Sequence, residues 1–256
     1  MSHTLQIARR ELGSFFLSPM AYIALVVFYS IFGLIFYFAK VSPDANAYAT
    51  ADMVALFFWT TLLLVLLAPV FTMGLIAEER RLGTLEGLLT APVTHTALVV
   101  GKFVAAMGLY VVLLLPSAVH TYILFRYSSV GPDVWKLAAG YLGLLLLGAF
   151  MLSFGLMCSC LARAQTAAAL VSIITLFLFW LLGFFMGETP PATLANDTRE
   201  HVLQGLYRGA KFVAYGRHYD SFMTGALDLR DIIFFVSFTV FFLFVGVTAV
   251  ANRKWR

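Results

Sequence analysis

The chain has 256 residues, of which 61% are hydrophobic and only 12% are charged. Soluble domains are about 45–50% apolar and about 25% charged. A soluble fold of this length could not cover so much apolar surface, so the composition excludes an ordinary water-soluble domain and indicates a membrane protein. The net charge of +4 is small, and no basic patch suited to nucleic acid is visible.

Residues 3–17, before the first apolar run, are predicted to form an amphipathic helix. Its apolar face holds Leu5, Ala8, Leu12, Phe15 and Phe16. Its polar face holds Gln6, Arg9, Arg10 and Glu11. A basic helix with aromatic residues is typical of the membrane interface, where Arg9 and Arg10 would anchor it. An ordinary charged flank before a membrane span is the alternative.

Six apolar runs are long enough to cross a bilayer, which takes about 20 residues. They cover about residues 20–39, 54–76, 98–125, 137–160, 166–187 and 232–251. With both termini inside, the inner side holds most of the basic residues near the spans, namely Arg9, Arg10, Arg80, Arg81, Lys102, Arg163, Arg253, Lys254 and Arg256. The short outer features hold only Lys40, Arg126 and Lys136. The positive-inside rule therefore predicts that both termini are cytoplasmic.

The longest predicted loop, residues 188–231, lies on the outer side. Asp197 and Glu200 are spaced to cap a helix start. Apolar residues then recur at helical spacing, at Val202, Leu206, Ala210 and Val213. We expect a short helix here, which either lies on or dips into the outer leaflet or covers the bundle as a solvated lid.

Two stripes of small residues indicate places where helix backbones approach closely. One consists of Gly101, Ala105 and Gly108, and the other of Gly155, Ser159 and Ala162. Packing within one bundle is the first interpretation, and a dimer seam is the second.

The interiors of the spans carry almost no ionisable side chains; His120 and Lys102, near the two ends of the third span, are the nearest cases. Ion-coupled carriers and channels need charges at depth, so both classes are disfavoured. We interpret His120 as hydrogen-bonded within the bundle, and Cys158 and Cys160 as small buried residues, with no metal site. The chain has no zinc-protease, nucleophile-elbow or phosphate-loop motif, so no residue is predicted to be catalytic. If ATP drives this protein, another polypeptide must bind it.

A dense charged stretch, residues 78–92, lies between the second and third spans. Leu82, Leu85 and Leu89 can line one helical face, and Pro92 ends the segment. The charges are Glu78, Glu79, Arg80, Arg81 and Glu86. This pattern favours a docking surface for a soluble partner, with a solvated loop as the alternative. We refer to residues 78–92 as the coupling segment.

The coupling segment, with Gly101-Lys102 after it, resembles the coupling element of ABC-2 type transporter permeases. Residues 9–22 are similar to the interfacial helix of that family, which leads into its first span. Residues 222–231 and the final 252–255 are similar to its gliding-motility permease branch.

This resemblance implies an all-α integral membrane fold in one domain, residues 1–256, with six transmembrane helices, an N-terminal interfacial helix and a cytoplasmic coupling helix. It implies a permease of the bacterial inner membrane that pairs with a second permease half, identical or not, and with a cytoplasmic ABC ATPase. That ATPase would bind the ATP and Mg and would hydrolyse the ATP, so this chain needs no cofactor. The expected coupling residues are Glu78, Glu79, Arg80, Arg81, Leu85 and Glu86.

Three functions remain open from the sequence. The first is ATP-driven transport, expected to be export because the family consists mostly of exporters. The second is mechanotransmission, in which ATPase strokes move periplasmic partners and no substrate is carried. The third is a membrane scaffold that never meets an ATPase. A substrate path between the halves would separate the first two, and only a scaffold would tolerate disruption of the coupling segment.

Overall fold

The computed structural model describes residues 3–38, 53–83, 94–127, 131–185 and 212–252, together with Gly205 and Gly209. Within these ranges the regular elements are helices and no strand occurs, which confirms the all-α fold. Six candidate membrane spans are long and apolar enough to cross a bilayer. They are α2 (Pro19–Phe36), α3 with α4 (Val54–Thr72 and Gly74–Arg81), α6 with α7 (His95–Leu114 and Ser117–Tyr127), α8 (Val134–Leu161), α9 (Gln165–Phe185) and α12 (Leu229–Ala251). Two further helices are α1 (His3–Leu17) and α11 (Tyr215–Thr224).

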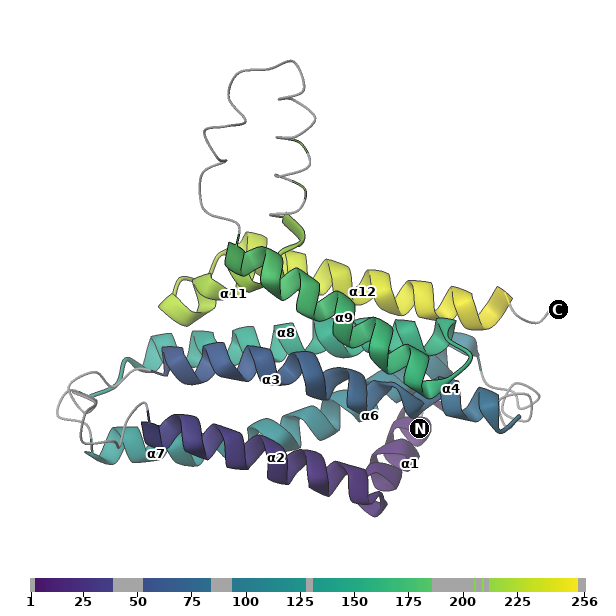
Figure 1. Cartoon of the computed structure of the whole chain (residues 1–256), viewed down its shortest axis with the longest axis horizontal. Coiled ribbons are helices and arrows are strands. Elements are labelled where there is room, and N and C mark those ends of the chain that lie inside the picture. Colours follow the sequence, from purple (N-terminus) through teal and green to yellow (C-terminus); the bar gives the residue numbers. More distant parts are fainter. Residues whose placement is uncertain are drawn as a thin grey trace.

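The long helices run alongside one another, and the two further helices lie at opposite ends of the bundle (Figure 1). Helix α1 is steeply inclined to the spans at the end that also holds α4 and the last turns of α12. Helix α11 lies at the other end, beside the start of α12. We call these the α4 end and the α11 end.

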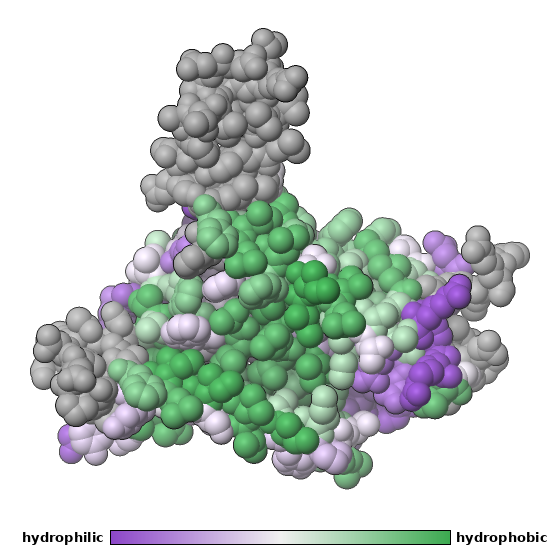
Figure 2. Space-filling model, viewed as in Figure 1, coloured by the Kyte–Doolittle hydropathy of each residue, from purple (hydrophilic) through white to green (hydrophobic). Residues whose placement is uncertain are grey.

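Helix α8 is the centre of the packing. In its most apolar window 72% of the residues are buried, against 17% in that of α9. Figure 2 shows apolar side chains across the middle of one face and hydrophilic ones gathered at the α4 end. An apolar band bounded by polar ends is the surface that a bilayer requires.

Proline accounts for the breaks inside two of the spans. Pro69 lies in the last turn of α3, and the helix is interrupted at Met73 before α4 begins. Pro116 lies between α6 and α7. Proline lacks the N–H that an α-helix needs and its ring crowds the preceding turn, so a break at these points follows from the sequence.

The helical structure at the end of the second span extends further than the predicted end of that span. That span was expected to end near residue 76, with the coupling segment starting at 78. Instead, α4 continues as a helix to Arg81. The coupling segment therefore begins inside a helix that is continuous with the membrane bundle apart from the break at Met73.

The helix expected in the outer loop, over residues 197–213, falls mostly outside the described residues. The described helix of this loop is α11, which starts at Tyr215 and ends with Gly225 in the left-handed conformation at φ 85°. Tyr215, Tyr219 and Phe222 are buried, so α11 is a packed part of the bundle and not a solvated lid. Its buried residues recur every three or four positions, a signal that the sequence carried.

Both stripes of small residues mark close packing within the bundle. A Cβ at Gly101 would lie 2.9 Å from the Ile7 side chain, and one at Gly108 would lie 3.2 Å from Leu12. The helix that packs on this stripe is therefore α1 and not another span. On the second stripe, a Cβ at Gly155 would lie 2.2 Å from the Thr72 hydroxyl oxygen.

The remaining single residues have ordinary packing roles. The His120 ring lies edge-on to Phe32 and Phe36, with ring centroids 4.9 and 4.8 Å away. Cys158 and Cys160 are buried free thiols. These three side chains therefore lie within the packing of the helices.

Candidate coupling site

The break between α3 and α4 is closed by a hydroxyl group from α8. The first four N–H groups of a helix have no carbonyl partner within that helix. In α4, two of them, on Ile76 and Ala77, donate to Ser159 Oγ at 3.2 and 3.1 Å. The same hydroxyl donates to the Met73 carbonyl at 2.9 Å. One buried serine thus fixes the start of α4 to α8.

Arg80 fixes the other end of α4 to the same helix. Its guanidinium donates to the carbonyl oxygens of Cys160, at 2.6 Å, and Ala162. The last carbonyls of a helix lack partners within the helix and carry partial negative charge, which favours a cation there. Arg80 therefore caps α8, and α4 is held to α8 at both of its ends.

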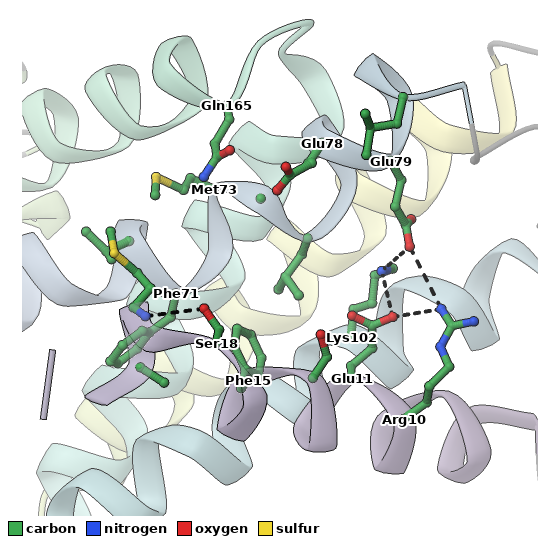
Figure 3. A pocket seen from close by; sticks show the side chains of 17 residues that line it. Arg10, Glu11, Phe15, Ser18, Phe71, Met73, Glu78, Glu79, Lys102 and Gln165 are labelled. Atoms are coloured by element: carbon green, nitrogen blue, oxygen red, sulfur yellow. Dashed lines mark hydrogen bonds and ion pairs between the residues drawn. The ribbon is translucent and has the colours of Figure 1, made fainter. Parts of the chain in front are cut away.

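A second set of contacts joins α4 to α1 and α6. The Lys102 ammonium, on α6, lies 2.7 Å from Glu79 Oε1 of α4 and 3.1 Å from Glu11 Oε1 of α1. The Arg10 guanidinium lies 2.9 Å from the same Glu11 oxygen and 3.9 Å from Glu79 Oε1. We call Arg10, Glu11, Glu79 and Lys102 the charge cluster (Figure 3).

The charge cluster is largely withdrawn from water. The Lys102 side chain is 1% exposed, and those of Glu11 and Glu79 are 14% and 18% exposed. Burial alone would raise the pKa of Glu11, but the charges and hydrogen bonds of Lys102 and Arg10 outweigh it and hold the pKa below its ordinary value. The formal charges of the two cations and two carboxylates sum to zero, which is the condition for keeping such groups buried.

The rest of the described coupling segment faces outward. The side chains of Arg81 and Glu78 are 61% and 44% exposed and lie 3.5 Å apart. Leu82 is 62% exposed, and Gly83 turns the chain with φ 70°. Glu78, Arg81 and Leu82 thus form a small exposed surface at the end of α4.

The six predicted coupling residues therefore have different positions. Glu79 and Arg80 are turned into the bundle, Glu78 and Arg81 outward, and Leu85 and Glu86 lie outside the described residues. Of the predicted anchors, Arg10 joins the charge cluster and Arg9 is exposed.

Sequence reasoning missed three residues of this site: Glu11, Lys102 and Ser159. Glu11 was assigned to the polar face of α1, and Leu5 to its apolar face. In the structure Glu11 faces α6, whereas Leu5 is 50% exposed. The small-residue stripe on α6 was the available signal for Lys102. It receives α1, and Lys102 directly follows its first residue, Gly101.

The arrangement offers positioning and no bond-making chemistry. Polar contacts hold α4 to three other helices: to α8 through Arg80 and Ser159, and to α6 and α1 through Glu79. A displacement of α4 would therefore have to move these helices with it or break charged contacts.

Six membrane-crossing helices, an amphipathic helix across one end and a charged helix held between them define a polytopic membrane protein built like a permease. The sequence profile of the ABC-2 family transporter proteins matches residues 5–252, and the chain belongs to that family. It is therefore a membrane permease component of an ABC transporter, a class that normally works with a separate ATPase subunit. No curated protein matches the chain. The narrower similarity to gliding-motility permeases stays a prediction.

Proposed function

We propose that this chain is the permease subunit of an ATP-driven exporter and that a separate cytoplasmic ATPase drives it through the coupling segment. In this proposal the α4 end faces the cytoplasm of a bacterial cell, with both termini on that side of the inner membrane. ATP and Mg are bound by the ATPase, which also hydrolyses the ATP. Two permease halves, identical or different, complete the transporter.

The observation that carries the proposal is the double attachment of α4. The coupling segment starts inside this helix, whose inward residues contact α8, α6 and α1 while Glu78 and Arg81 face outward. A load applied to the exposed surface would reach three parts of the bundle through short polar contacts. Such coupling requires that each state of the ATPase favours a different arrangement of the permease.

The residues of the segment have separable roles in this proposal. Arg81, which is exposed, and Leu85, which lies outside the described residues, contact the ATPase. Glu79 and Arg80, which face the bundle, transmit the movement. Export is supported by the family resemblance alone, because the described residues show nothing that selects a direction.

The test is purification of the tagged permease from its native host in mild detergent, with mass spectrometry of the proteins that accompany it. We expect an ATP-binding subunit with the wild type and its loss, by tenfold or more, with Leu85→Asp or Arg81→Glu. The control is Arg126→Glu, which reverses an exposed arginine in the last turn of α7, away from α4. It should retain the ATPase.

Membrane insertion of each variant is checked by carbonate extraction, because a variant that fails to insert would also lose the ATPase. If Leu85→Asp keeps the ATPase at the wild-type level, the assigned docking role is wrong. If no ATPase accompanies the wild type in several mild detergents, a scaffold becomes the better description of the chain.

A further inference from the structure

A cavity of about 530 Å³ opens beside the charge cluster. Its walls come from α1, the first turn of α2, both sides of the α3–α4 break, and single residues of α6 and α9. Figure 3 shows Phe15 and Phe71 on one side of this space, Arg10 and Lys102 on another, and Glu78 with Gln165 across from them. The cavity thus joins an apolar wall to a charged one.

The cavity lies at the level where a bilayer changes from hydrocarbon to head groups. Its lining includes Met20, in the first turn of a membrane span, and Leu82, just past the end of α4; these are 46% and 62% exposed. Leu17, at the bend between α1 and α2, is 86% exposed. Apolar side chains exposed around a charged cavity favour an amphiphilic occupant and not a water-soluble ion.

One carboxylate of the lining lies outside the charge cluster. The charge cluster contributes two cations and two carboxylates, which are paired with one another. The remaining lining charge is Glu78, whose carboxylate has Arg81 at 3.5 Å and is 44% exposed. Arg81 does not line the cavity but offsets the charge of Glu78, so the site is neutral as a whole and suits a zwitterionic head group. The Glu78 carboxylate lies across the cavity from Arg10 and Lys102 (Figure 3).

One polar side chain lies beside this carboxylate. A Cβ at Gly74 would lie 3.3 Å from Glu78 Oε2 and 3.5 Å from the Gln165 amide nitrogen, so the two side chains meet over a glycine that leaves them room. The Glu78 carboxylate suits a primary ammonium, which has three N–H donors, better than a quaternary ammonium, which has none. Arg10, 58% exposed at the same cavity, suits a phosphate.

From this arrangement we infer that the cavity binds the head group of an amphiphile with a primary ammonium, as in phosphatidylethanolamine. The ammonium pairs with Glu78, the phosphate lies toward Arg10, and the acyl chains leave past Met20 into the bilayer. The volume suits a head group and glycerol, since pockets of about 300–1,000 Å³ hold drug-sized molecules. The same chemistry could belong to a bilayer lipid or to a transported cationic amphiphile. Neither source depends on the ATPase proposed above.

The experiment is a titration of the purified full-length permease, without the ATPase, followed by native mass spectrometry. The probes are the dihexanoyl forms of phosphatidylethanolamine, phosphatidylcholine and phosphatidylglycerol, together with dodecylamine. We expect phosphatidylethanolamine to bind about tenfold more tightly than phosphatidylcholine, as one charge-assisted hydrogen-bonded contact predicts. Glu78→Gln should remove this preference, and Arg81→Gln should keep or strengthen it, because Arg81 lies 3.5 Å from Glu78 Oε1 and competes with the ammonium for this carboxylate.

The outcomes are distinct. Equal binding of the two zwitterionic lipids, a preference for phosphatidylglycerol, or a preference unchanged by Glu78→Gln would each overturn the inference. If phosphatidylethanolamine binds more tightly than dodecylamine, the site is built for a bilayer lipid. If dodecylamine binds at least as tightly, a cationic amphiphile as cargo is favoured. Thermal unfolding of Glu78→Gln should match the wild type, because this side chain is nearly half exposed.

Discussion

The two ends of this bundle hold their short helices by different kinds of contact. At the α4 end, charged groups from three helices meet around Lys102, and Arg80 and Ser159 close the backbone of α4 and α8. At the α11 end, aromatic side chains fill most of the space between helices, and one polar pair, His218 with Asp231, joins α11 to α12. The Tyr215 hydroxyl donates to the Leu176 carbonyl at 3.0 Å, and the His218 ring stacks on Phe234 with centroids 3.9 Å apart.

The difference bears on how each end can move. Charge-assisted hydrogen bonds depend on distance and direction, so a helix held by several of them either moves its neighbours or loses the bonds. Contacts between apolar rings have weaker directional preferences, so rings can rearrange at lower cost. This comparison makes the α4 end the better transmitter of an applied displacement and the α11 end the more adjustable one.

The comparison is tested most severely by Lys102→Met, which removes the ammonium that joins α4, α6 and α1. Two largely buried carboxylates, Glu11 and Glu79, would then lie close together without the ammonium that lies between them. Breaking a buried ion pair from one side costs about 3–5 kcal/mol. We expect a loss of that size in the free energy of unfolding, measured by denaturant titration in detergent. Adding Glu11→Gln and Glu79→Gln to this variant should restore most of the loss. No recovery in the triple variant would mean that Lys102 acts mainly through packing.

At the α11 end, the most informative change is Asp231→Asn. His218 Nδ1 lies 2.7 Å from Asp231 Oδ1, and its Nε2 lies 3.0 Å from the Phe212 carbonyl oxygen. Removing the carboxylate charge weakens one charge-assisted hydrogen bond, for which we expect a loss of about 1.5–3 kcal/mol. Hydrogen–deuterium exchange should rise in α11 and remain unchanged in α4. The control, Asp220→Asn, makes the same chemical change at an exposed residue of α11 and should have a smaller effect.

Gly155→Ala tests the contact between α8 and the break before α4. Its Cβ would lie 2.2 Å from Thr72 Oγ1, so either the Thr72 side chain must rotate away from its bond to the Ala68 carbonyl or the helices must separate. Overpacking of this kind costs about 1–3 kcal/mol, against a gain of up to about 1 kcal/mol from replacing glycine in a helix. We expect a net loss in thermal stability, partly reversed by adding Thr72→Ala. Gly33→Ala is the control, since nothing lies within 4 Å of its Cβ, and that variant should not lose stability.

The spans and the family could be predicted from the sequence because long apolar runs and the coupling segment are local patterns. The charge cluster could not, because it depends on side chains brought together by the fold: Lys102 is 23 positions from Glu79 and belongs to another helix. Glu11 was misassigned because the position of α1 on α6 decides which face is buried. The sequence predicted Ser159 only as a small residue at a helix contact. Its hydroxyl bonds to the backbone at the break at Met73, and that break could not be read from Ser159 itself.

Helix α11 shows the opposite case, in which a local signal was present and not used. Tyr215, Tyr219, Phe222 and Met223 have helical spacing, and Gly225 follows at the position where a left-handed residue ends a helix. The helix predicted in this loop covers residues 197–213, which lie mostly outside the described residues, and none was predicted at residues 215–224. The apolar face of a buried helix is the sequence signal that indicates it, and charged capping residues can occur without such a face.

The smallest expected effect is the response of the charge cluster to acid. The pKa of Glu11 is lower in the folded protein than its ordinary value of 4.5, so its contribution to stability is fully present above that value. As the pH falls through the lowered pKa, the carboxylate is protonated and the contribution is lost. The stability difference between the wild type and Glu11→Gln should therefore be constant near neutral pH and shrink below pH 4.5. A Glu11→Gln difference that stays constant into acid would show that its carboxylate charge does not stabilise the contact of α1 with α6, and the α4 end would then resemble the α11 end in depending on packing.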